Sequence, residues 1–557
     1  MDYGFDRFLR YDEMSRWLHD IVAAHPGLAT IESYGTSHEG RPLLLVTITD
    51  TATGPHHEKP AHWVDANIHS IEVTGGVAAL HLIHHLLTRH AAGDARVREA
   101  LATRTFYVAP RVNPDGVEAA LGDRPRYRRS SMRPWPWRDA HRWPGLEQHD
   151  VDGDGRVRSM RIADPHGAWV EHPSDPRVMI PREHDDAPDG APRFRLLAEG
   201  TITDWDGFTV PVPRSVEGLD LNRNFPAGWS QKVTGAGDHP LSEPEIDALV
   251  RAVTARPNVC GYNAYHTSGG FLLRPSSTMP DSSLPPEDVW VFGQLGKRCT
   301  SLTSYPVHSV YEDLTWDKSD VMSGAADDWA YEHLGVYGWT TEFWDAVAAT
   351  GTGRSGTDIW YVGPTVEQEL AVAAWCDVHA PGGYASWVPF DHPQLGPVEI
   401  GGADDFHVWT NAPASRLSDE VAPHAEFAVH QALLSPALAV VHTAVERLGD
   451  DTWRIAVGVA NTGWLPTDVS VQARRKNLVL PVSVSIDGAE PVDGPARIRL
   501  GQLEGRVAFA LAGGSRNDGT PDRALATWVV RAPVGTEVRV EAAHPRAGTA
   551  RTVVRLD

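Results

Sequence analysis

One stretch of the chain, Ala61–Glu72 (AHWVDANIHSIE), constrains the fold more than any other. It predicts a buried strand that ends near His69 and Glu72, followed by a helix over Val73–His90. A histidine and a glutamate three residues apart at a strand end can place an imidazole nitrogen and a carboxylate on one metal ion. This spacing alone is a weak signal, because a chain with 27 histidines contains such a pair by chance about once or twice.

Strands and helices alternate along this part of the chain, which predicts an α/β sheet covered on both faces. The predicted strands are Pro42–Thr49, Ala61–His69, Thr105–Pro110, Asn258–His266 and Val336–Glu342. In such sheets, functional residues collect where strands end, and His69, Glu72, His266 and Glu342 all do. Two imidazoles and one carboxylate leave a fourth position for water, as in catalytic zinc sites. Glu342 would then accept a proton from that water.

Residues from about 129 to 215 interrupt this alternation. They are rich in Pro, Trp, Asp and Arg and contain short β-like pieces, which predicts an inserted lid or wall. Within it, Asp150, Asp152 and Asp154 have the D-x-D-x-D-G spacing of a calcium loop. The twelfth position is Arg161 and not Glu, which excludes an EF-hand. Calcium binding and an ion-free acidic turn both stay open.

The pattern changes beyond residue 400. A connecting segment, 401–434, is expected to hold one helix. From 435 to 557 apolar and small or polar residues alternate, which predicts an all-β sandwich without a recognisable catalytic cluster. The predicted organisation is therefore a catalytic domain over 1–400 that carries the insertion, a connector and an accessory sandwich whose partner the sequence does not name.

Composition excludes several classes of partner. A formal net charge of −23 argues against nucleic acid and against an anionic membrane surface. No run of 18 apolar residues is present, so no spanning helix is expected. The three cysteines, Cys260, Cys299 and Cys376, suggest no disulfide framework and suit a reducing compartment. The N-terminus lacks the basic start and apolar core of a signal peptide, so we expect a cytoplasmic protein.

Several motifs, taken in order, resemble the zinc carboxypeptidase family that contains carboxypeptidases A and B. His69 and Glu72 in HSIE match its H-x-x-E motif, and His266 in AYHTSGG matches its third zinc ligand. Glu342 in GWTTEFWD matches its general base, and SYGTSHEGRPL, NPDG and LDLNRNFP resemble further family signatures. The resemblance covers Asp2 to about Gly382. It implies a mixed-sheet catalytic domain with a zinc ion on His69, Glu72 and His266.

The resemblance also implies how a substrate is held. Asn222 and Arg223 in LDLNRNFP match the pair that binds the substrate's terminal carboxylate. Arg128 in RPRYRRS falls where the oxyanion-stabilising arginine is expected, although a solvated basic face also explains this arginine-rich stretch. Asp327 aligns with the base of the side-chain pocket, where carboxypeptidase B-like members carry Asp, and implies a preference for C-terminal Lys or Arg. The alternative is that Asp327 caps a helix over 328–334.

One family feature is missing, because Asp320 stands where the family's mobile tyrosine is expected. The expected function is a zinc-dependent exopeptidase that removes the C-terminal residue from peptides with a free C-terminus. Two alternatives are an amidase of the same fold, acting on cell-wall peptides or γ-glutamyl bonds, and a catalytically silent binding protein.

Overall fold

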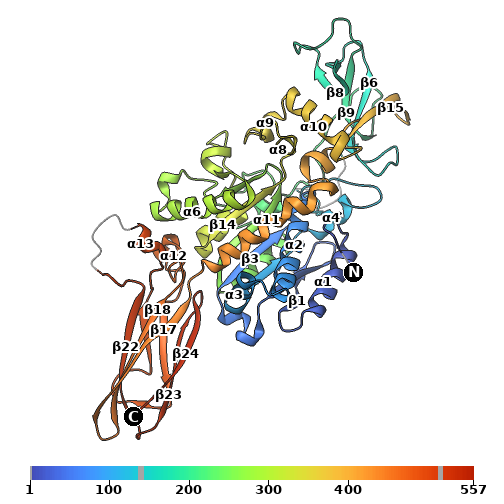
Figure 1. The fold of residues 1–557 in the computed structure, drawn as a ribbon. Coiled ribbons are helices and arrows are strands. Elements are labelled where there is room, and N and C mark those ends of the chain that lie inside the picture. The colour runs from blue at the N-terminus through green and yellow to red at the C-terminus, as the bar shows by residue number, and fades with distance from the viewer. Residues whose placement is uncertain (1–2, 136–142, 512–517) are drawn as a thin grey trace.

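The computed structural model describes residues 3–135, 143–511 and 518–557, so residues 136–142 of the predicted insertion lie outside the described residues. Its centre is an eight-stranded mixed sheet (Figure 1). In spatial order the strands are β1 (Ala29–Thr36), β2 (Pro42–Ile48), β4 (Thr105–Ala109), β3 (Ala61–Ala66), β11 (Val259–Thr267), β14 (Tyr337–Phe343), β12 (Phe271–Arg274) and β13 (Val307–Ser309). The middle strands β4, β3, β11 and β14 run parallel, so their carboxyl ends share one edge.

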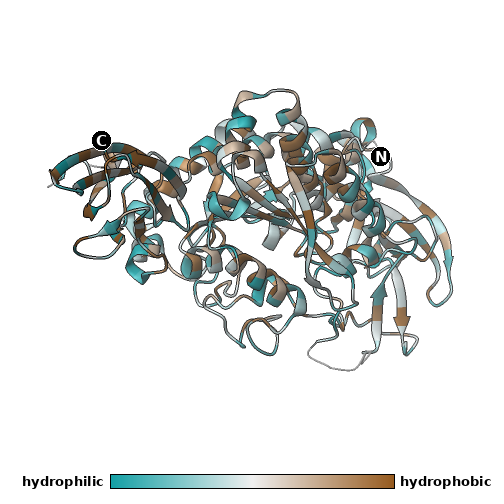
Figure 2. Cartoon of the chain, turned by 90° about the horizontal axis from the view of Figure 1, so that it is seen from below, coloured by the Kyte–Doolittle hydropathy of each residue, from teal (hydrophilic) through white to brown (hydrophobic). Residues whose placement is uncertain are grey.

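Helices cover both faces of this sheet and explain why its middle strands β4, β3 and β14 are buried along their whole length. One face packs against α1 (Tyr11–Ala24), α2 (Val73–Ala91), α3 (Ala95–Thr103), α8 (Ala346–Thr350), α10 (Val366–His379) and α11 (Ala414–Leu433). The other packs against α5 (Pro244–Thr254), α6 (Pro286–Thr303) and α7 (Ala326–Trp329) with its continuation, the π-helical turn η6 (Ala330–Leu334). Val64 faces the first core and Trp63 the second, as alternation along β3 requires. The strands are accordingly brown in Figure 2.

The helix expected in the connecting segment belongs instead to the catalytic core. Helix α11 packs against α2 and buries Leu417, Val421 and Ala428 in the first core. Arg104, at the end of α3, donates to the carbonyl oxygens of Ala432 and Ser435, 3.0 and 3.2 Å away. The helix expected within 401–434 is therefore present, and its apolar face completes the layer that covers the sheet; the division of the chain at residues 400 and 434 stays a prediction.

The insertion contributes four strands to a six-stranded sheet, which a hairpin over 384–403 completes, and it forms a separate hairpin of its own. A six-stranded sheet contains, in spatial order, β15 (Tyr384–His392), β16 (Gly396–Ala403), β6 (Ser159–Ala163), β9 (Phe194–Ala198), β7 (Trp169–His172) and β8 (Asp175–Pro181). A separate hairpin pairs β5 (Gly145–Gln148) with β10 (Gly200–Thr203). The six-stranded sheet projects from the catalytic body in Figure 1. Its use as a lid stays a prediction.

The C-terminal part is a β-sandwich, which confirms the predicted fold class. One sheet holds β17 (Leu438–Gly449), β18 (Thr452–Asn461), β22 (Arg523–Arg531) and β20 (Glu490–Pro491); the other holds β21 (Arg497–Gly501), β19 (Val482–Asp487), β23 (Glu537–His544) and β24 (Gly548–Arg555). Inward residues such as Trp453, Val484 and Val540 form its core. In Figure 1 the sandwich and the projecting insertion lie at opposite ends of the catalytic body. Among the described residues, no helix has the length and apolar character that crossing a membrane requires.

Candidate active site

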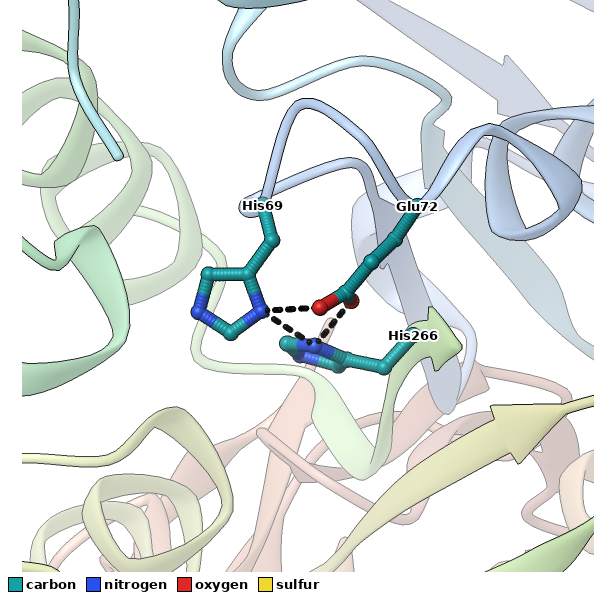
Figure 3. A group of neighbouring side chains, drawn as sticks. All are labelled: His69, Glu72 and His266. Atoms are coloured by element: carbon teal, nitrogen blue, oxygen red, sulfur yellow. Dashed lines mark hydrogen bonds and ion pairs between the residues drawn. The ribbon is translucent and has the colours of Figure 1, made fainter. Parts of the chain in front are cut away.

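Three side chains that the sequence predicted as metal ligands converge at the carboxyl edge of the central sheet (Figure 3). His69 and Glu72 lie in the turn between β3 and α2, and His266 lies on the neighbouring strand β11. The Nδ1 atom of His69 is 2.8 Å from one carboxylate oxygen of Glu72, and the Nδ1 atom of His266 is 2.9 Å from the other. Asn67 shapes the turn, since it takes a left-handed φ of 56° and its amide donates to the Glu72 carbonyl at 2.7 Å.

The chemistry of this donor set fits a zinc ion. The two imidazole Nδ1 atoms lie 3.1 Å apart and both face the Glu72 carboxylate, and one donor atom from each residue lies within 4.8 Å of the others. A cation between them satisfies two nitrogen lone pairs and a carboxylate that are buried together. Burial alone would raise the pKa of Glu72, but the two imidazoles hold it well below its usual range.

Sequence reasoning missed one residue of this site, Asp220. Its Oδ1 atom is 3.0 Å from Nε2 of His69, on the side of the ring away from the metal-facing Nδ1. A carboxylate in this place fixes the tautomer and orientation of a ligating imidazole. Against the effect of burial, the charges of Arg129 and His69 hold the pKa of Asp220 well below its usual range. Asp220 lies in the motif LDLNRNFP, two residues before Asn222. Its place in this motif was the feature of the sequence that could have indicated a role in the site.

The arginine next to the metal ligands is Arg129, so the prediction of Arg128 is wrong by one residue. Arg129 lines the cavity, with Nη1 2.5 Å from Asp220 and Nε 3.9 Å from Glu72. Arg128 instead pairs with Glu217 at 2.9 Å. The hydroxyl of Ser70 donates to the carbonyl oxygen of Arg128, and the backbone N–H of Ser70 donates to that of Arg129 at 3.2 Å. These two bonds hold the backbone of both arginines beside the turn that carries the metal ligands.

Asn222 and Arg223 line the same cavity, as expected. The side-chain oxygen of Asn222 accepts a hydrogen bond from the backbone N–H of Ala326 at 2.9 Å. Its amide group is thereby turned so that the two N–H donors remain for a ligand. Nη1 of Arg223 donates to the carbonyl oxygen of Asn222 at 2.8 Å, which holds the guanidinium beside this amide. The pair offers the planar set of donors that a carboxylate requires.

Glu342 lies directly beside the metal ligands. It pairs with His266 in the parallel register of β11 and β14, and its side chain is buried. Its Oε2 atom has no hydrogen-bond partner among the described residues and lines the cavity. Burial, together with the negative charge of Glu72, raises the pKa of Glu342 well above its usual range. A carboxylate with a raised pKa next to a metal-binding group is suited to accept a proton.

Asp327 is buried in the wall of the cavity and is not the N-cap of a helix. Helix α7 begins at Ala326 with Ala325 as its N-cap, so Asp327 stands inside the first turn. Its Oδ1 atom accepts from the N–H of Asp328 at 3.0 Å, while Oδ2 has no partner among the described residues. Burial raises the pKa of Asp327. A buried carboxylate that lines a cavity and has one oxygen without a hydrogen-bond partner is suited to bind a cation.

The cavity that joins these groups has a volume of about 370 Å³. Part of its wall is apolar, contributed by Ile71, Leu273, Val310, Leu314, Met322 and Trp360. None of the described residues that line it is a tyrosine, and Asp320, at the position of the family's tyrosine, lies on an exposed turn. Among the described residues that line the cavity, proton transfer therefore falls to carboxylates and not to a tyrosine hydroxyl.

The acidic loop of the insertion is bonded to itself. The carboxylate of Asp150 accepts from the N–H groups of Gly153 and Gly155 at 2.6 and 2.9 Å, and Asp154 pairs with Arg158. Carboxylate oxygens of Asp150, Asp152 and Asp154 do lie close together, but exposed acidic groups often do so without an ion. Calcium binding at this loop stays a prediction.

An α/β sheet that carries two histidines, a glutamate and a neighbouring general base at its edge defines a metal-dependent hydrolase. The model of one family, described as zinc carboxypeptidase, matches residues 14–152 and 187–351. These segments are more than half of the chain, and the chain belongs to the zinc carboxypeptidase family. A second model, described as a domain of unknown function (DUF8731), matches residues 437–555.

Individual relatives are distant. The chain is 28% identical to carboxypeptidase B of Astacus astacus over 162 residues, which covers 29% of this chain and 44% of that protein. It is 21% identical to carboxypeptidase O of Bos taurus over 356 residues, which covers 62% of this chain and 72% of that protein. Among solved structures, carboxypeptidase A of Helicoverpa armigera has a TM-score of 0.39 at 18% identity, covering 68% of this chain and 75% of the other. The chain thus spans less than half the length of the carboxypeptidase B that it matches.

Proposed function

We propose that this protein hydrolyses the C-terminal peptide bond of peptides with a free C-terminus, as a zinc-dependent carboxypeptidase. The observation that carries the proposal is that Asn222 and Arg223, the pair suited to bind a carboxylate, line the same cavity as the metal ligands and Glu342. An enzyme that cuts inside a chain has no use for a charged clamp at this place. A silent binding protein would not need a buried, unpartnered Glu342 beside a complete ligand set.

Each group has a defined task in this mechanism. Arg223 and the amide of Asn222 hold the terminal carboxylate, which places the last peptide bond beside the metal ligands. A zinc ion on His69, Glu72 and His266 supplies, when bound, a water that ionises near neutral pH and a positive charge close to the peptide carbonyl. Glu342 accepts the proton of the attacking water and passes it to the leaving amine.

Arg129 stabilises the negative charge that develops on the carbonyl oxygen. Its guanidinium lies at the metal ligands, it lines the cavity, and its side chain is 45% exposed to solvent, so a substrate oxygen can reach it. Asp220 holds both this guanidinium and the ring of His69, and so keeps the two groups in a fixed relation. Asp220 is therefore a positioning residue in our proposal.

We further propose a preference for C-terminal arginine or lysine. Asp327 is buried in the wall of the cavity, its Oδ2 atom has no hydrogen-bond partner among the described residues, and a cationic side chain would give it one. An apolar side chain would leave this buried carboxylate unpaired, which disfavours binding. Calcium binding by Asp150, Asp152 and Asp154 is a separate proposal, supported only by their spacing and proximity.

Peptide pairs that differ only at the C-terminus test the proposed function. A peptide ending in a free carboxylate should be cleaved, and its C-terminal amide should lose most of the activity, because Arg223 would face no anion. Activity should disappear with a chelator and return with zinc. Equal cleavage of the free acid and the amide would contradict the exopeptidase geometry and favour an amidase of the same fold.

A further inference from the structure

The C-terminal sandwich forms hydrogen bonds with the chain segment that links Asp327 to Glu342. Asp327 stands in the first turn of α7, the helix continues through η6 to Leu334, and the chain then turns at Gly335 into β14, which carries Glu342. These hydrogen bonds lie at the turn, between Asp327 and Glu342 in the sequence. Their acceptors lie at the end of η6 and at Gly335.

Side chains of the C-terminal part cap the carboxyl end of this helix. They come from a loop of the sandwich and from the short helix α12 (Val471–Lys476), which lies between β18 and β19 in the sequence and is counted with the sandwich below. Nζ of Lys476 donates to the carbonyl oxygen of Glu332 at 2.9 Å, and Oγ of Ser470 donates to that of Gly335 at 2.7 Å. The guanidinium of Arg546 donates to the carbonyl oxygen of Leu334. The last carbonyl groups of a helix have no partner inside the helix, and cations stabilise its negative end. Here a different domain supplies these donors.

Arg546 is built into this contact. Its side chain is buried, and it also donates to the carbonyl oxygen of Asp468 at 3.0 Å. Gly335 has a φ of 65°, and a Cβ atom on it would lie 2.4 Å from the Cβ of Ala473 in the sandwich. The two parts are thus in close backbone contact, and the turn cannot move without moving the sandwich.

A buried carboxylate of α6 joins the same three pieces. Asp288 accepts hydrogen bonds from the hydroxyl groups of Tyr331 in η6 and Tyr337 in β14, each at 2.9 Å. It also accepts from the backbone N–H groups of Val471 and Gln472 in the sandwich, again at 2.9 Å. One carboxylate therefore ties the helix, the strand and the sandwich together.

Strand β14 contacts the backbone of Asp327 directly. A Cβ atom added to Gly338 would lie only 2.7 Å from the carbonyl oxygen of Asp327, so the first residues of β14 pack on the backbone of this aspartate. Tyr337, which Asp288 holds, is the neighbour of Gly338 in sequence. A shift of the turn is consequently passed to Asp327 through one backbone contact.

We propose that the C-terminal sandwich acts as a positioning element for the substrate pocket, with Arg546 and Asp288 as the positioning residues. This inference rests on the proposed function, because it takes Asp327 as the residue that reads the substrate's terminal side chain. The domain then acts through the orientation of Asp327 and not through a ligand of its own.

The test uses full-length, zinc-loaded protein. Arg546→Met removes the cap, Arg546→Lys restores a cation, and Arg551→Met is the matched control. Arg551 belongs to the same domain and pairs with Glu58 of the catalytic part, away from the turn. We would measure kcat and KM for matched peptides ending in Arg and in Leu, and amide hydrogen exchange over residues 326–343.

We expect Arg546→Met to lower kcat/KM for the Arg peptide about 10-fold, mostly through KM, and to affect the Leu peptide less. Arg546→Lys should recover part of the loss, and Arg551→Met should behave as wild type. Exchange should rise over 326–343 but not over β18. Equal losses for both peptides, or unchanged exchange over 326–343, would overturn the proposal.

Two further measurements cover the cases in which Arg546→Met does not fold or wild type shows no preference for the Arg peptide. If Arg546→Met does not fold, Asp288→Asn gives the same comparison from the catalytic side of the contact. If wild type shows no preference for the Arg peptide, the proposed specificity fails by itself. The positioning role is then decided by hydrogen exchange and by KM for whichever peptide wild type prefers.

Discussion

Replacing two adjacent arginines separately gives a sharp test of the proposed mechanism. Arg129 has its Nη1 atom 2.5 Å from Asp220 and its Nε atom 3.9 Å from Glu72, so its charge lies at the metal ligands. Removing one donor that faces a developing oxyanion costs about 2.7–4 kcal/mol of transition-state stabilisation, or about 10²–10³ in kcat. We expect Arg129→Ala to lose this much of kcat while KM changes little.

Arg128→Ala is the control, because this arginine faces away from the metal ligands. Its partner Glu217 keeps Arg126 at 3.2 Å and the hydroxyl of Ser215 at 2.5 Å. The substitution should therefore cost about 1–2 kcal/mol of unfolding free energy and leave kcat within a few-fold of wild type.

The assay compares kcat and KM of both variants on one peptide, after zinc content and melting temperature are measured. Zinc content matters because Arg129 also holds Asp220, which orients His69. A loss of kcat at full zinc content separates oxyanion stabilisation from metal loss. An activity loss in Arg128→Ala as large as that in Arg129→Ala would contradict the assignment of Arg129 to the oxyanion.

Four more outcomes are expected. Glu342→Gln should keep zinc yet lose several orders of magnitude in kcat, since the attacking water loses its base; turnover close to wild type would rule out this role. Asp220→Asn should weaken zinc binding about 10- to 100-fold, as measured by competition with a chelator, and an unchanged affinity would mean that His69 needs no orienting partner. Asp327→Ala should abolish the preference for peptides ending in Arg or Lys over Phe or Leu, and an unchanged ratio would show that another residue reads the side chain. If the Asp150–Gly155 loop binds calcium, millimolar calcium should raise the melting temperature of metal-stripped protein after zinc is restored, whereas no shift supports the ion-free turn.

The metal ligands could be predicted from the sequence because local patterns determine where strands end. His69 and His266 each follow an apolar run that both faces of the sheet bury, and parallel neighbours bring such ends together. Glu342 follows from the same argument on β14. The order of these motifs along the chain then indicated the family and, through it, the carboxylate-binding pair.

Features that depend on side-chain direction or on distant pairing could not be predicted. Arg128 and Arg129 are adjacent residues of the same type, so the sequence does not distinguish them. The hydrogen bonds of their backbone with Ser70 decide which one faces the metal ligands. Asp220 orients His69 because the two side chains lie 3.0 Å apart in the fold. Their separation in the sequence does not predict this contact. The helix near 419–434 has an amphipathic pattern that suits a connector or a core helix equally, and its packing against α2 decides.

The projecting six-stranded sheet has a consequence for how the chain is made. Strand β6 ends at residue 163, but its neighbour β16 ends at residue 403, so about 240 residues separate the synthesis of the two. At about 5–20 residues per second, the edge of β6 waits roughly 12–48 s on the ribosome before its partner emerges. An open edge of this kind can pair with a strand of another nascent chain. The insertion and the hairpin over 384–403 therefore complete one sheet only after most of the catalytic core between them has been synthesised.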